Sequence, residues 1–148
     1  MKTKFLTLLI AIVMIPFLAA CGDDDDNFNP NKFGSTSLRS SQWTGTLTKK
    51  YDVGTVQKDR VANCGMIFDS KKGGEFSCQW TDTYEKTEKV SFTYKISGKS
   101  VIFTSSDNIL SGEYIVLEYS SSKMKLTKGT GSFGSDNFYL DLTRVGGN

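Results

Sequence analysis

The chain has 148 residues, with 18 basic and 16 acidic side chains and no histidine. Its lysines stand in small groups among Ser and Thr, without the density of a nucleic-acid footprint, so we expect no nucleic-acid partner. Without histidine, no Ser-His or Cys-His pair can form and the usual acid-base group of neutral pH is missing. We therefore predict a protein that is not an enzyme and has no cofactor.

The first twenty residues have the three parts of a cleaved signal peptide. A positive start at Met1 to Lys4 leads into an apolar stretch from Phe5 to Leu18, and the small residues Ala19 and Ala20 follow. That apolar stretch is short for a membrane span and contains a proline, which favours a signal over a transmembrane helix. We expect residues 1–20 to be removed.

The sequence Leu18-Ala19-Ala20-Cys21 resembles the lipobox of bacterial lipoproteins. The resemblance implies that Cys21 becomes the first residue, with a diacylglycerol on its thiol and a further acyl chain such as palmitate on its amino group. Two or more acyl chains give stable membrane anchoring. The implied partner is the membrane and the implied location is the outer membrane. The alternative is an ordinary secretory signal that happens to be followed by a cysteine.

Residues 21–36 are rich in Asp, Asn, Gly and Ser, and we interpret them as a flexible acidic tether. Asp23 to Asp26 have two interpretations. Four consecutive carboxylates repel one another and stay solvated, which by itself explains them. They also resemble the signal that exports lipoproteins of the Bacteroidota to the outer face of the outer membrane. Both interpretations stay open.

Residues 37–148 read as one all-β domain. There is no proline after Pro30, and Gly, Ser and Thr interrupt the chain every eight to twelve residues, as in a meander. Alternation of apolar and polar residues predicts eight strands, over residues 42–51, 61–69, 75–80, 88–97, 100–104, 112–119, 123–128 and 138–145. In the sixth, Gly112 to Tyr119, both faces are bulky, so its inward face is not predicted. Eight antiparallel strands with short connections favour an up-and-down barrel, because closure removes exposed edges.

Several segments are similar in order and spacing to the lipocalin-like domains of Bacteroidota lipoproteins. They are Trp43 with Gly45, the hairpin over residues 67–76, the segment 92–103 and the closing residues 140–144. The resemblance implies a lipocalin-like barrel that binds a small apolar or amphipathic molecule. It also implies that Arg144, near the end of the barrel, covers Trp43 on the first strand.

The inward-facing aromatic residues are the candidate ligand-binding groups. Together with Arg144 they are Trp43, Phe68, Phe76, Trp80, Phe92, Tyr94 and Phe103. An eight-stranded barrel is just wide enough to be filled by side chains or to hold one small ligand. If it is filled, the alternative function is that of an inhibitor or accessory subunit that contacts another protein through its surface. The long polar connections at 81–87 and 129–136 are the candidate binding rim, and we expect a monomer.

Cys64 and Cys78 fall on the same face of neighbouring predicted strands. A hairpin centred near Lys71 places them opposite each other, and the expected extracytoplasmic location permits oxidation, so we predict a disulfide. The alternative is two buried free thiols that pack as small apolar groups. No metal site is expected, because two thiols without histidine do not complete a zinc shell.

Overall fold

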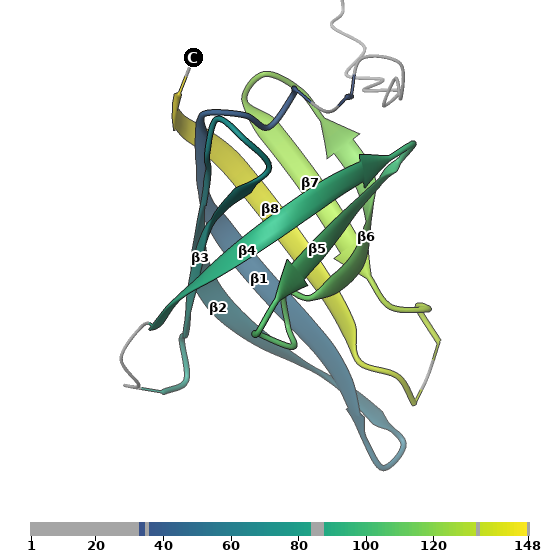
Figure 1. Cartoon of the computed structure of the whole chain (residues 1–148). Coiled ribbons are helices and arrows are strands. Elements are labelled where there is room, and N and C mark those ends of the chain that lie inside the picture. Colours follow the sequence, from purple (N-terminus) through teal and green to yellow (C-terminus); the bar gives the residue numbers. More distant parts are fainter. Residues whose placement is uncertain (1–32, 35, 84–87, 133, 148) are drawn as a thin grey trace, which may run out of the picture.

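The computed structural model describes residues 33–147, except for residues 35, 84–87 and 133. Eight antiparallel strands form a closed up-and-down barrel in which β1 pairs with β8 (Figure 1). The strands are β1 (Ser41–Val53), β2 (Val56–Phe68), β3 (Gly73–Trp80), β4 (Glu88–Ser97), β5 (Ser100–Ser105), β6 (Gly112–Tyr119), β7 (Lys123–Lys128) and β8 (Asn137–Gly147). The predicted fold class is confirmed. The described residues contain no helix of the length and apolarity that a bilayer crossing requires.

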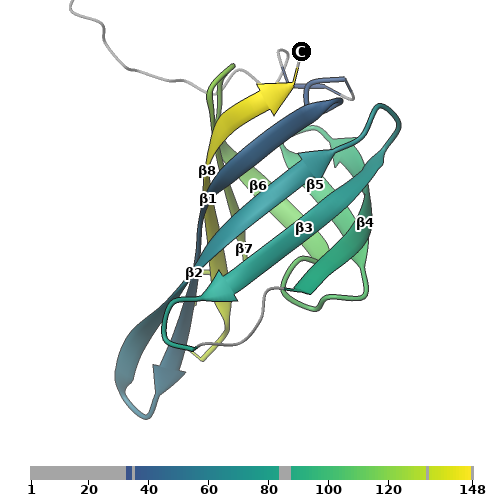
Figure 2. The ribbon, with the colours of Figure 1, turned by 90° about the vertical axis from the view of Figure 1, so that its left-hand side faces the viewer.

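The first hairpin is longer than the sequence predicts. β1 continues past Tyr51 to Val53, and β2 begins at Val56 rather than Val61. Gly54, with a φ of 63°, supplies the positive φ of a two-residue hairpin turn. Residues 49–53 and 56–60 therefore pair with each other, including residues 52–53 and 56–60, which the sequence leaves between two predicted strands. They form an arm that projects beyond the other connections (Figures 1 and 2).

The structure settles the inward face of β6. Tyr114 and Val116 are buried, whereas Ile115 and Leu117 are 48% and 51% exposed. The register between β6 and β7 then shifts after Val116, as in a β-bulge. This shift places Tyr119 opposite the buried Met124 and returns it to the inner face.

The chain enters the barrel at the end that also carries the turns after β2, β4 and β6, which we call the tether end (Figure 1). Phe33 and Leu38 are buried there, and the Phe33 ring packs 4.7 Å from the Tyr119 ring, centroid to centroid. The Tyr119 hydroxyl donates to the carbonyl oxygen of Ser37 at 2.7 Å. The Ser40 amide donates to the carbonyl oxygen of Asp69 at 3.0 Å. Residues 33–34 and 36–40 thus cover the tether end.

The opposite end, which we call the arm end, is closed by the loop between β5 and β6. One carboxylate oxygen of Asp107 accepts the amide protons of Ile109 and Leu110, each at 2.8 Å, and the turn inserts Leu110 at 0% exposure. The Lys128 ammonium reaches across from β7 and donates to the carbonyl oxygen of Ser111 at 2.8 Å and to that of Ile109. Among the described residues, apolar side chains thus fill both ends of the barrel.

Candidate functional site

The predicted ligand-binding aromatics lie in the barrel interior and pack against one another. Those with at most 5% exposure are Trp43, Phe68, Phe76, Phe92, Tyr94 and Phe103. The rings of Phe68 and Tyr94 meet edge to face at 5.2 Å, and those of Phe92 and Phe103 at 5.4 Å. This is the preferred geometry of aromatic pairs in a dense core. At Gly74, an added Cβ would lie 2.7 Å from the tip of the Phe92 ring, so the missing side chain makes room for that ring.

The structure brings Trp43 and Arg144 together as the resemblance implies. They are partners in the β1 and β8 register, and the guanidinium carbon lies 5.9 Å from the centre of the indole. The indole nitrogen donates to the Ser41 hydroxyl at 2.8 Å, and that hydroxyl donates to the carbonyl oxygen of Leu38. Trp43 is therefore fixed on both sides, and it serves to close the tether end.

Trp80 differs from the other predicted ligand-binding aromatics because it is only partly buried. It lies at the arm end, where the Arg60 guanidinium stacks 4.3 Å from its ring centre. The same guanidinium donates to the Asp82 carboxylate at 2.8 Å and lowers the pKa of that carboxyl. Of the predicted binding rim, residues 84–87 and Phe133 lie outside the described residues.

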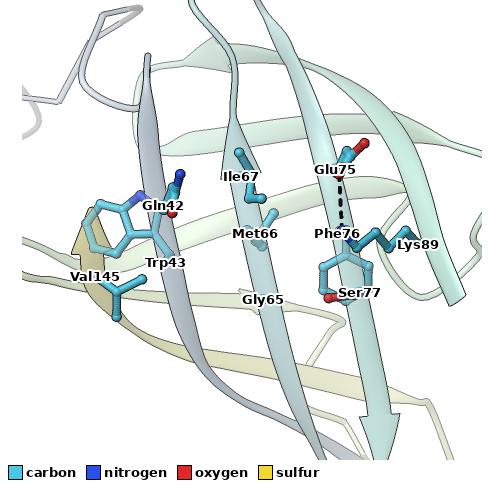
Figure 3. A pocket seen from close by; sticks show the side chains of 10 residues that line it. All are labelled: Gln42, Trp43, Gly65, Met66, Ile67, Glu75, Phe76, Ser77, Lys89 and Val145. Carbon is cyan, nitrogen blue, oxygen red and sulfur yellow. Dashed lines mark ion pairs between the residues drawn. The ribbon is translucent and has the colours of Figure 1, made fainter. Parts of the chain in front are cut away.

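A hollow of about 230 Å³ lies on the outer wall over β1, β2 and β3 (Figure 3). Its lining includes the exposed apolar side chains of Ile67 and Val145, which are 43% and 60% exposed. Gly65 also lines the hollow and has no side chain to fill it. A Cβ added there would meet only the Ser77 hydroxyl at 3.4 Å and a backbone oxygen at 3.8 Å. We call this feature the outer hollow.

A second hollow, of about 480 Å³, adjoins the first along β3 and β4. Ile67 and Glu75 line both, so the two form one continuous band across the outer wall. The Lys89 ammonium lies 3.8 Å from the Glu75 carboxylate (Figure 3). Both side chains are more than half exposed, so this pair contributes little to stability and is free to exchange partners.

Cys64 and Cys78 are direct partners in the register between β2 and β3, as predicted. Both are free thiols in the structure, so the disulfide itself stays a prediction. Burial, together with the neighbouring Cys78, raises the pKa of Cys64 to about 12. Burial also raises the pKa of Cys78. Among the described residues there is no cluster of three or more metal-ligating side chains.

The sequence analysis did not identify the residues that fill the arm end, Leu110 and Lys128, or the glycine that lines the outer hollow, Gly65. Leu110 and Lys128 do not belong to any motif, although Asp107 followed by Asn108 is a typical turn start that indicates an ordered loop. Gly65 is one of 14 glycines, and its importance depends on its outward position opposite Ser77.

Comparisons of the chain with protein-family models, with curated proteins and with solved structures find no match. The lipocalin-like assignment therefore stays a prediction, and the function is argued from geometry.

Proposed function

We propose that this protein is a lipid-anchored protein of the cell envelope that acts on another protein through its outer surface. The observation that carries the proposal is the closure of the barrel at both ends, by Leu38 and by Leu110, each at 0% exposure. A lipocalin-like carrier of a small apolar molecule needs an open mouth and an empty interior. Here inward side chains from all eight strands pack into one core cluster.

The outer hollow and the second hollow that adjoins it form the binding face. The outer hollow, of about 230 Å³, accommodates a protruding side chain of a protein partner. Ile67 and Val145 supply exposed apolar contact area, and Glu75 and Lys89 supply charges at the rim. An apolar centre with a polar rim is the usual composition of a protein interface.

The binding face is tested by placing a photo-crosslinking amino acid at Val145 and, as a matched control, at Leu117. Both side chains are apolar and about half exposed or more, but Leu117 is on β6, away from the outer hollow. On intact cells we expect a discrete protein adduct from position 145 and none from position 117. Equal adducts from both positions, or none from either, would contradict the proposed face.

The alternative function, a carrier of a small apolar or amphipathic molecule, is tested by native mass spectrometry of protein purified from its own organism. We expect the mass of the lipidated chain without a further bound molecule. A stoichiometric apolar ligand that is released on unfolding would favour the carrier function and overturn the proposed one.

The anchoring part of the proposal concerns residues outside the described structure, Cys21 and Asp23 to Asp26. Cys21→Ala removes the acylated thiol, so incorporation of labelled fatty acid should vanish; label that persists would refute the lipid anchor. Replacing the four aspartates by Ala should keep the label but reduce protease accessibility on intact cells. Unchanged accessibility would mean that these residues act only as solvated charge.

A further inference from the structure

The positive charge of the folded domain is unevenly distributed along the barrel axis. The tether end carries Arg39 in the closing segment and four lysines in or beside the three turns. These are Lys71 and Lys72 after β2, Lys99 after β4 and Lys123 at the start of β7. All four lysines are exposed. Because the strands alternate in direction, these turns lie at the same end as the point where the chain enters (Figure 1).

The tether end has few carboxylates to neutralise these cations. Asp69 lies in the turn after β2, and its carboxylate accepts the amide protons of Lys71 and Gly73 at 2.7 and 3.0 Å. Lys71, Lys72 and Lys123 form no ion pair with a described residue. Their ammonium groups therefore face solvent.

At the arm end, by contrast, three of the basic side chains are paired with carboxylates. Three ion pairs join Lys49 to Asp136 at 2.7 Å, Lys50 to Asp59 at 2.9 Å and Arg60 to Asp82 at 2.8 Å. From Phe33 onward the chain has 18 − 3 = 15 basic and 16 − 4 = 12 acidic residues, and the exposed lysines of the tether end contribute to this excess.

We propose that the tether end is a docking surface for the anionic phospholipid headgroups of the membrane that carries the anchor. The inference rests on the proposed lipid anchor for its biological setting. Phe33 is twelve positions after Cys21, and covalent geometry limits the distance between them to about 40 Å. A lipid at Cys21 therefore keeps the tether end near the bilayer, and the lysines then orient the barrel with this end toward the headgroups. The arm, at the opposite end of the barrel, then points away from the headgroups, whereas the outer hollow opens sideways on the wall near the tether end.

The headgroups compete with another possible occupant, the acidic run Asp23 to Asp26 of the same chain, which lies within reach of the tether end. We favour the membrane because the cations are spread over three turns around the rim of the barrel, as a flat charged surface requires. A four-residue segment would cover only part of that rim.

The test uses residues 21–148 with Cys21→Ser, so that no acyl chain contributes to binding. Partition to vesicles of equal parts phosphatidylglycerol and phosphatidylcholine is measured at low salt and compared with vesicles of phosphatidylcholine alone. We expect binding only to the anionic vesicles, and weakening as salt is added, because screening shortens the range of the attraction. Each basic residue near the surface contributes a factor of about five.

The decisive variant is the triple substitution Lys71→Gln, Lys72→Gln and Lys123→Gln, which should weaken partition by about 100-fold. The matched control is Lys50→Gln, Lys58→Gln and Lys89→Gln, which removes the same charge from the arm and the barrel wall. Equal losses in the two triple variants, or no binding to anionic vesicles, would overturn the proposal.

A last variant replaces Asp23 to Asp26 by Asn. If only this variant binds the vesicles, the acidic run occupies the tether end and the membrane proposal is wrong. Because the chain in these experiments is unlipidated, failure here is distinguishable from failure of the lipid anchor, which fatty-acid labelling of the Cys21 variant reports.

Discussion

The prediction with the sharpest geometric basis is the disulfide between Cys64 and Cys78. The amide of Asp69 donates to the carbonyl oxygen of Gly73, which makes these two residues a hydrogen-bonded pair of the ladder between β2 and β3. Hydrogen-bonded and non-hydrogen-bonded pairs alternate along an antiparallel ladder. Five steps further along, Cys64 and Cys78 therefore form a non-hydrogen-bonded pair. Their Cα atoms are then typically about 4.5 Å apart, at the short end of the range that a disulfide accepts.

The expected magnitude follows from the size of the closed loop. The bridge would enclose the 15 residues from Cys64 to Cys78, which in the chain-entropy description corresponds to roughly 3 kcal/mol of stabilisation through the unfolded state. For a domain of this size, that difference corresponds to a change in Tm of roughly 10 to 15 °C. Formation transfers two electrons and two protons from the thiols to an oxidant such as oxidised glutathione.

The assay compares protein refolded with oxidised glutathione and protein refolded with a reductant. Thiols are counted in denaturant, because the raised pKa of Cys64 makes it slow to react in the folded state. We expect no free thiol and a higher Tm in the oxidised sample. The variant with both cysteines replaced by Ala should have the same Tm under either condition. Two titratable thiols after oxidative refolding, or oxidation without a change in Tm, would refute the reasoning.

Three further predictions concern the closure and packing of the barrel. Lys128→Met should lower the free energy of unfolding by about 2 kcal/mol, because the β5–β6 loop loses its charged hydrogen-bond donor. This value is a net one, since the variant also no longer buries a charge. Lys125→Met, on the same strand, removes an ion pair on the outer wall and should lower the free energy of unfolding by under about 1 kcal/mol. Tyr114→Phe should cost about 1 kcal/mol, since its buried hydroxyl donates at 2.6 Å, whereas Tyr94→Phe should be neutral or stabilising, since its buried hydroxyl has no partner among the described residues. Gly45→Ala should destabilise by about 1–3 kcal/mol, because the new Cβ would lie 2.0 Å from a backbone oxygen of β8. Urea unfolding of each variant measures these changes, and equal effects within either matched pair, or a neutral Gly45→Ala, would contradict the corresponding contact.

Local sequence patterns predict all eight strands and most of their inward faces, although not the arm of the first hairpin. In β4, alternation identifies Phe92 and Tyr94 as inward, and both are buried. The hairpin between β2 and β3 determined the pairing of Cys64 with Cys78, because a tight turn fixes the register of the residues on either side of it. These properties depend on neighbours within one or two strands, which a local pattern records.

Other features depend on closure of the barrel and are visible only in the folded domain. Only the bulge after Val116 assigns Tyr119 to the inner face, and only the packed interior shows that Leu110 fills the arm end. The position of Lys128 over the β5–β6 loop joins residues that are 17 or more positions apart, with no periodic signal to mark them. Whether an eight-stranded barrel is full or empty depends on the summed volume of side chains from all its strands. The interior volume that these side chains must fill is set only when β1 pairs with β8 and closes the barrel.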